Sequence, residues 1–235
     1  MNQQKIAFIS GGNRGIGKEI CRQLIQNGYA VILGSRNLEK GLEAATEMQG
    51  ILGAGRKVEV CEIDLNDIES ISKAAQWVEN NYGRVDLLIN NAGILPNADN
   101  SAHVSIATIE ATFQTNLYGP LLTSQKFLPL LKLSDSPRIV NVTSGMGTYE
   151  EMGGGYTAYR LSKAAINSLS SMMAIDLKLE GVKVVAACPG WCQTDMGSPN
   201  APRTAAEGAA SIVWAATAKE AESGKIYRDG KLLGP

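Results

Sequence analysis

The alternation of short apolar runs with longer segments of helical period constrains the fold of this chain more than any other feature of its sequence. The apolar runs that have the length of strands are Lys5–Ser10, Tyr29–Leu33, Lys57–Ile63, Val85–Asn90, Arg138–Val142 and Val182–Cys188. Their continuous apolar character is typical of strands that are buried on both faces. With a last short strand at Lys225–Arg228, the pattern predicts an α/β fold, a doubly wound parallel sheet of about seven strands with helices on both faces.

The segments between these strands predict the helices that cover the sheet. They begin near Gly15, Leu38, Ile68, Ser105, Asn116 and Thr157, and a further helix is expected at about Thr204–Thr217. A chain of 235 residues is long enough for one well-covered core, so we expect a single domain over residues 1–235. The turn-rich stretch at about 189–203 is longer than most connections, and long loops in compact domains are often functional. It is the expected substrate loop.

Charge and composition indicate a small molecule as the partner. The 22 basic residues balance 23 acidic ones, which gives no electrostatic reason to expect nucleic acid or an anionic membrane. The N-terminus lacks the pattern of a signal peptide, and no apolar run is long enough to cross a bilayer. The four cysteines and the one histidine lie too far apart for a typical metal site. We therefore expect a cytoplasmic protein that has unpaired thiols and no metal.

A glycine-rich turn follows the first predicted strand and leads directly into a helix. Glycine lets a chain turn tightly and lets its backbone approach a pyrophosphate, to which the helix N-terminus presents N–H donors. The spacing departs from the G-x-G-x-x-G pattern, because three residues lie between the first two glycines that matter, Gly11 and Gly15. The predicted dinucleotide-binding residues in this turn are Gly11, Asn13, Arg14, Gly15, Ile16 and Gly17.

The end of the second predicted strand indicates which dinucleotide the site prefers. An NAD site usually has an acidic residue there that accepts hydrogen bonds from the ribose 2′-hydroxyl. In this sequence Ser35 and Arg36 occupy the place, and the first carboxylate is Glu39. An arginine can bind a 2′-phosphate through its planar guanidinium, and Arg14 can reach the same phosphate from the glycine turn. The sequence therefore predicts NADPH rather than NADH, with Asp64 and Leu65 at the adenine edge.

Tyr159 and Lys163 are four residues apart, so on a helix they share one face with Cβ atoms about 5–6 Å from each other. A tyrosine with its ordinary pKa is too weak an acid for proton exchange at neutral pH. A nearby ammonium favours the phenolate, and we expect Lys163 to lower the pKa of Tyr159. Ser144 ends the fifth predicted strand at the same edge of the sheet, where its hydroxyl can donate to a carbonyl oxygen.

The order of these motifs resembles the short single-domain branch of the short-chain dehydrogenase/reductases, which have a Rossmann-type fold. The resemblance rests on the glycine turn, Asn90-Asn91-Ala92-Gly93, Asn116, Ser144, Tyr159, Lys163 and Pro189-Gly190. It implies that Asn116, Ser144, Tyr159 and Lys163 are catalytic, with Tyr159 the general acid. Tyr159 and Lys163 would also contact the cofactor, Lys163 at the nicotinamide ribose, and Asn116 would distort a helix and hold a water. The resemblance further implies that Asn91, Ala92, Gly93, Pro189, Gly190 and Thr194 contact the cofactor.

Within that family the glycine turn, Ser35-Arg36 and Cys188-Pro189-Gly190-Trp191 most resemble the carbonyl reductases. Only residues 145–158 separate Ser144 from the tyrosine helix, whereas monomeric members of that group carry a long insertion there. The resemblance therefore implies a homodimer or a homotetramer. The candidate substrate lining comprises Leu95, Tyr149, Trp191 and Met196.

The sequence leads to one principal function and two alternatives. The principal function is the reduction of a ketone or aldehyde by hydride transfer from NADPH, with Tyr159 as the proton donor. One alternative is a reductase of 3-oxoacyl thioesters, for which Arg160 and Arg203 are the only cationic indications of a carrier site. The other is a non-catalytic dinucleotide sensor, against which the intact set of Ser144, Tyr159 and Lys163 argues.

Overall fold

A computed structural model of the chain describes residues 4–52 and 58–234. Its strands are β1 Ile6–Ser10, β2 Ala30–Ser35, β3 Val58–Glu62, β4 Leu87–Asn90, β5 Arg138–Val142, β6 Lys183–Ala187, β7 Ile226–Arg228 and β8 Lys231–Leu232. Its α-helices are α1 Gly15–Gln26, α2 Leu38–Leu52, α3 Ile68–Tyr82, α4 Ile106–Phe113, α5 Gly119–Leu131, α6 Thr157–Asp176 and α7 Ala205–Thr217. Short helical turns lie at Gln114–Tyr118, Gly145–Gly147 and Lys178–Glu180.

These strands form one sheet in the order β3-β2-β1-β4-β5-β6-β7-β8, and all neighbours are parallel except β7 and β8. The predicted α/β fold, a doubly wound parallel sheet with helices on both faces, is confirmed. The eighth strand, Lys231–Leu232, adds to the expected seven because the chain turns back on itself after β7. Of the strand predicted at Lys57–Ile63, the structure has Val58–Glu62 as β3, and Lys57 lies outside the described residues.

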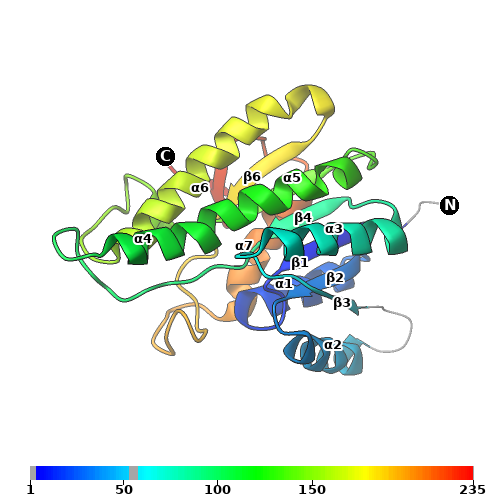
Figure 1. Cartoon of the computed structure of the whole chain (residues 1–235), viewed down its shortest axis with the longest axis horizontal. Helices are drawn as coiled ribbons and strands as arrows, with labels where there is room; N and C mark the ends of the chain where they lie inside the picture. Colours follow the sequence, from blue (N-terminus) through cyan, green and yellow to red (C-terminus); the bar gives the residue numbers. More distant parts are fainter. Residues whose placement is uncertain (1–3, 53–57, 235) are drawn as a thin grey trace.

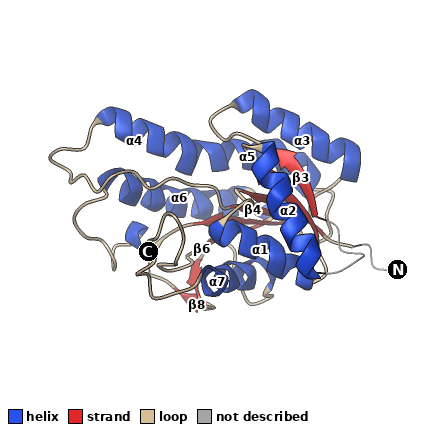
Figure 2. Cartoon of the chain, turned by 90° about the horizontal axis from the view of Figure 1, so that it is seen from below, coloured by secondary structure: helices blue, strands red, loops and turns tan. Residues whose placement is uncertain are grey.

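Two apolar clusters lie on opposite faces of the sheet, and the strand period divides their residues. Along β1, Ala7 and Ile9 pack with residues of α1, α2 and α7, while Ile6 and Phe8 pack with α3, α5 and α6. Figures 1 and 2 show these two helical layers, with the sheet between them. Double-sided burial explains why the strands read as continuous apolar runs.

Local signals set several helix boundaries. Asp67 caps α3 by accepting a hydrogen bond from the Glu69 N–H, and Gly83 ends this helix in the left-handed conformation. Thr204 and Glu207 form a reciprocal capping box at the start of α7. The helix predicted from Asn116 begins instead at Gly119, because a π-helical turn occupies Gln114–Tyr118.

The strand order places the candidate residues at one edge. It reverses direction between β1 and β4, and parallel sheets of this kind bind ligands beyond the carboxyl ends of the strands at such a switch point. Within the described ranges no helix combines the length and apolar character that a membrane-crossing helix needs.

Candidate active site

The glycine turn between β1 and α1 has the conformation that a phosphate site requires. Gly11 and Gly15 have φ values of 67° and 52°, which favour glycine, and Asn13 lies in the turn between them. An added Cβ at Gly17 would lie 2.1 Å from the carbonyl oxygen of Gly11, so only glycine fits there. Ile16 packs against the core at the start of the helix.

The N-terminus of α1 is free to bind an anion. Arg14 precedes the helix in an extended conformation, and its side chain makes no capping hydrogen bond. The first turn also holds no acidic side chain. Uncapped N–H groups and the positive end of the helix dipole therefore face the edge where the strands end, and the turn fits a dinucleotide phosphate.

The two arginines that predict the dinucleotide differ in their surroundings. Arg36 is exposed between β2 and α2, and its guanidinium has no hydrogen-bond or ion-pair partner among the described residues. Beside it the buried Ser35 hydroxyl donates to the carbonyl of Asn37 at 2.8 Å. Arg14, in contrast, forms an ion pair with Asp195 of the 189–203 segment at 2.8 Å. Arg36 is thus the arginine that is available to an incoming anion.

The segment after β4 lies against the glycine turn. The Asn91 side chain donates to the carbonyls of Ser10 and Gly11 at 2.9 and 3.1 Å. An added Cβ at Gly11 would lie 3.0 Å from Ala92, so these two backbones are in close contact. Gly93 continues this segment. An added Cβ at Gly93 would lie 3.8 Å from the Lys163 Nζ, so the segment approaches the tyrosine helix.

Two other predicted cofactor segments border the same edge. Asp64 and Leu65 follow β3, and the Asp64 N–H donates to the Ser70 hydroxyl at 2.9 Å. Leu65 is buried against Gly119 at the start of α5. Thr194 reaches the glycine turn, since an added Cβ at Gly15 would lie 3.2 Å from its Cγ2. The predicted cofactor residues therefore come from five separate loops that meet at the carboxyl ends of the strands.

Ser144, Tyr159 and Lys163 meet beyond the end of β5. The Ser144 hydroxyl accepts from the Met146 N–H at 3.2 Å, and its side chain lies close enough to Tyr159 to lower the pKa of that phenol. The Lys163 Nζ lies 5.5 Å from the centre of the Tyr159 ring and donates to the carbonyl of Val142 at 2.9 Å. Since Val142 ends β5, this hydrogen bond ties the lysine to the strand that carries Ser144. The helical spacing and the strand end together produce the expected grouping.

The protonation of this group differs from the expectation. Burial raises the pKa of Tyr159 to about 12, and the Ser144 side chain lowers the pKa only in part. Burial also lowers the pKa of Lys163 to about 8, while the nearby Cys188 raises it. The expected lowering of the tyrosine pKa by Lys163 is not found in the described chain, because burial raises this pKa and Lys163 is not among the groups that shift it. Tyr159 is a neutral phenol that holds its proton at neutral pH.

Asn116 lies in the centre of the π-helical turn and is almost fully buried. Its Oδ1 accepts from the Ile94 N–H at 2.8 Å, and its Nδ2 donates to the Ile94 carbonyl and to the Ser162 hydroxyl. The amide thereby joins the segment after Gly93 to the tyrosine helix. Its side chain fixes the position of two predicted functional segments, and a water-binding role for Asn116 remains an expectation.

The predicted substrate residues differ in their exposure. Tyr149 is 86% exposed, Met196 is 44% exposed, and Leu95 is half-buried. Trp191 is 57% exposed, and its indole N–H donates to the carbonyl of Gly197 within the same loop. Trp191 thus anchors the 189–203 segment in addition to any contact with substrate.

The cations that suggested a carrier site are occupied within the chain. Arg160 donates to the backbone carbonyls of Gly155, Met146 and Glu151. Arg203 forms a bidentate pair with Asp229 at 2.7 Å. Neither guanidinium is free to bind a phosphopantetheine phosphate.

The described ranges also hold no cluster of three or more side chains suited to a metal ion.

Two serines at the site went unnoticed in the sequence. The Ser10 hydroxyl accepts hydrogen bonds from the N–H groups of Asn91 and Ala92 and so holds the β4 loop beside β1. Ser162 accepts from Asn116 and lies next to Lys163 on α6. The place of Ser10 at the end of a buried strand is a signal that could have identified it, whereas Ser162 has no signal apart from its neighbours.

The fold and the glycine turn at its switch point define a Rossmann-type protein. A sequence model of the family described as short chain dehydrogenase matches residues 5–205. The chain belongs to this family of oxidoreductases.

Similar proteins agree with this assignment. A short-chain dehydrogenase of Penicillium roqueforti (strain FM164) is 36% identical, and the alignment covers 97% of this chain and 95% of the relative. A (+)-neomenthol dehydrogenase of Arabidopsis thaliana is 31% identical over 89% of this chain and 90% of the relative. The crystal structure of an NADPH-bound carbonyl reductase from chicken fatty liver has a TM-score of 0.90 and 27% sequence identity, and the match covers 99% of this chain and all of that one.

Proposed function

We propose that the protein is an NADPH-dependent carbonyl reductase, which reduces a ketone or an aldehyde to an alcohol. The observation that carries the proposal is the grouping of Ser144, Tyr159 and Lys163 beyond the end of β5, where the Lys163 Nζ lies 5.5 Å from the centre of the tyrosine ring. A hydroxyl donor, a phenol that retains its proton and a cation suit a carbonyl oxygen that gains negative charge and then a proton.

In this mechanism each side chain acts on the substrate oxygen or on its proton donor. The bound NADPH would supply the hydride to the carbonyl carbon. Ser144 donates a hydrogen bond to the carbonyl oxygen, and Tyr159 transfers its phenolic proton to that oxygen. The Lys163 ammonium stabilises the phenolate that remains. The high pKa of Tyr159 suits reduction, because the phenol holds its proton until charge develops on the oxygen.

The proposed ligands follow from the same contacts. The free guanidinium of Arg36 supports NADPH over NADH, and the occupied Arg160 and Arg203 support a small carbonyl substrate over a carrier-bound thioester. We also propose a homodimer or a homotetramer in the cytoplasm. The apolar side chains exposed along α6 support the oligomer, and the four free cysteine thiols support the cytoplasm.

The experiment that tests the proposal follows NADPH oxidation at 340 nm with a panel of carbonyl compounds. The panel contains cyclic ketones, aryl ketones, aldehydes and a 3-oxoacyl thioester of N-acetylcysteamine. We expect turnover of ketones or aldehydes with NADPH. Turnover of the thioester alone would favour the alternative reductase, and binding of NADPH without turnover of any compound would favour the dinucleotide sensor.

The rate of reduction is expected to fall as the pH rises through about 8. Lys163 has a lowered pKa, so it is charged below this pH and neutral above it, where it no longer stabilises the Tyr159 phenolate. Tyr159 itself keeps its proton throughout this range, because its pKa is raised. Above pH 8 the rate should fall by about tenfold for each pH unit, as the loss of one proton requires.

The measurement is the single-turnover rate with saturating NADPH between pH 6 and 10, and Cys188→Ala is the control. The Cys188 thiol is the other titratable group that influences Lys163 and Tyr159. The fall should persist in the Cys188→Ala variant. A wild-type profile that stays level to pH 10 would show that Lys163 is not the titrating group.

A further inference from the structure

Two loops border the candidate site, and a charged side chain lies over a glycine in each. In the loop after Ser144, an added Cβ at Gly145 would lie 1.8 Å from the Glu151 Oε2. In the loop after β6, an added Cβ at Gly190 would lie 2.8 Å from the Arg203 Cδ. Glu151 thus covers the residue that follows Ser144, and Arg203 covers the predicted nicotinamide loop.

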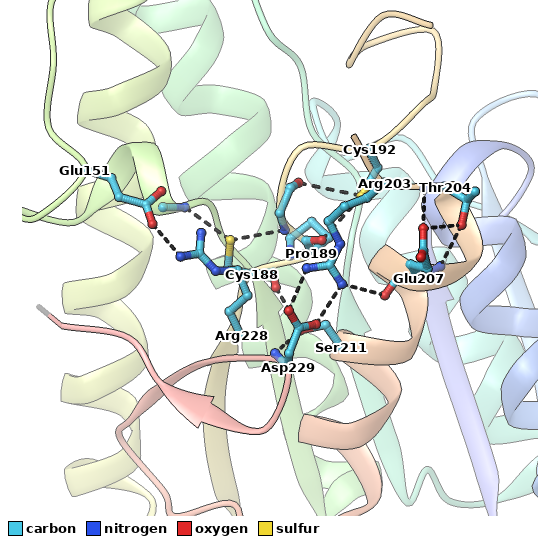
Figure 3. Close-up of polar contacts among 12 residues, drawn as sticks. Glu151, Cys188, Pro189, Cys192, Arg203, Thr204, Glu207, Ser211, Arg228 and Asp229 are labelled. Carbon is cyan, nitrogen blue, oxygen red and sulfur yellow. Dashed lines mark hydrogen bonds and ion pairs between the residues drawn. The ribbon is translucent and has the colours of Figure 1, made fainter. Parts of the chain in front are cut away.

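The turn between β7 and β8 supplies an opposite charge to each of these side chains. The Arg228 guanidinium donates to the Glu151 carboxylate at 2.6 Å, and Arg203 donates to both oxygens of Asp229 at 2.7 Å. Arg228 and Asp229 are consecutive, so the four side chains form one row of alternating charge (Figure 3). The row joins the Ser144 loop to the Gly190 loop.

Other contacts hold this row in place. Asp229 has a φ of 54°, and its N–H donates to the Ser211 hydroxyl at 2.8 Å, which fixes the turn to α7. The Cys188 sulfur accepts from the N–H groups of Gly145 and Gly190 at 3.2 and 3.3 Å, and so it connects the same two loops beside the Arg228 guanidinium. Both loops are therefore joined to each other through the row and through the Cys188 sulfur (Figure 3).

The exposure of these ion pairs indicates whether they stabilise the fold or fix the geometry of the loops. The side chains of Glu151 and Arg228 are 39% and 32% exposed, and those of Arg203 and Asp229 are 22% and 50% exposed. Partly exposed ion pairs add little to folding stability, whereas a bidentate arginine–carboxylate pair fixes geometry. A role in setting the distance between two loops therefore explains the row better than a role in stability.

We propose that Glu151, Arg228, Asp229 and Arg203 are positioning residues that hold the two active-site loops at a fixed spacing. The turn between β7 and β8 then controls how Ser144 faces the predicted nicotinamide loop at Pro189-Gly190. The consequence for catalysis rests on the proposed reductase function, whereas the holding of the loops does not.

Hydrogen–deuterium exchange on the full-length protein tests the holding of the loops directly. Arg228→Gln removes the positive charge that pairs with Glu151, and Asp229→Asn removes the negative charge that pairs with Arg203 while asparagine still tolerates the left-handed backbone. We expect exchange to rise at least about threefold in residues 145–156 of the first variant and in residues 189–203 of the second. Lys132→Gln is the matched control, because it removes an ion pair with Glu180 at the opposite edge of the sheet and should change neither loop.

Steady-state kinetics on the same variants test the consequence. Arg228→Gln should lower kcat with little change in KM for NADPH, and Asp229→Asn should raise KM for NADPH. The double exchange Glu151→Arg with Arg228→Glu should restore kcat, which a loss of stability alone would not allow. Unchanged exchange in both loops would overturn the proposal.

The outcomes separate this proposal from the proposed function. One outcome is that the wild type is active and exchange rises in the variants while their kinetic constants equal those of the wild type. In that case the positioning role in catalysis is wrong. If the wild type reduces no carbonyl, the proposed function fails, and the exchange data alone decide whether the row holds the loops.

Discussion

Replacing Tyr159 by phenylalanine is expected to lower the turnover number for carbonyl reduction by about 10²- to 10⁴-fold, the range that a general acid contributes. The substitution removes the phenolic proton and leaves the ring, which packs 5.5 Å from the Lys163 Nζ. Ser144 retains its hydroxyl, but the phenol that lies beside it is lost. The dissociation constant of NADPH, measured by fluorescence titration, should change little.

Tyr156→Phe is the matched control for this variant. Tyr156 lies three residues earlier, immediately before α6, and it also presents a phenol near the surface. Its replacement should leave the turnover number unchanged. If Tyr159→Phe keeps more than about a tenth of the wild-type rate, another group supplies the proton and the proposed mechanism is wrong.

Replacing Arg36 by alanine is expected to lower kcat/KM for NADPH by about 10- to 100-fold and to leave kcat/KM for NADH unchanged. A hydrogen bond to a charged group contributes about 1.5–3 kcal/mol, and the 2′-phosphate is the only part of NADPH that NADH lacks. Arg36 should have the larger effect of the two arginines, since Arg14 is already paired with Asp195. The comparison of the two specificity constants in wild type and variant is the measurement.

Lys178→Ala provides the control for a lost surface cation, because Lys178 follows α6 at the opposite edge of the sheet. It should alter neither specificity constant. A wild type with equal constants for the two dinucleotides, or with a preference for NADH, would reject the cofactor assignment. An equal loss with both dinucleotides in Arg36→Ala would indicate a structural role for Arg36.

The fold followed from local patterns that depend on neighbouring residues alone. Double-sided burial made the strands continuous apolar runs, and the strand that was expected at Arg138–Val142 has those bounds in β5. The helix that was expected at about Thr204–Thr217 lies at Ala205–Thr217, and the local capping box of Thr204 and Glu207 accounts for its start. The π-helical turn at Asn116 was the exception, since it depends on contacts with Ile94 and Ser162.

The sequence by itself determined where the candidate residues lie, because strand ends and helical spacing place Ser144, Tyr159 and Lys163 at one edge of a parallel sheet. The tertiary structure alone decided their protonation, since burial depends on every segment that covers them. It also decided which charges pair across the site. Glu151 and Arg228 are 77 residues apart, and only the turn of the chain after β7 brings them together.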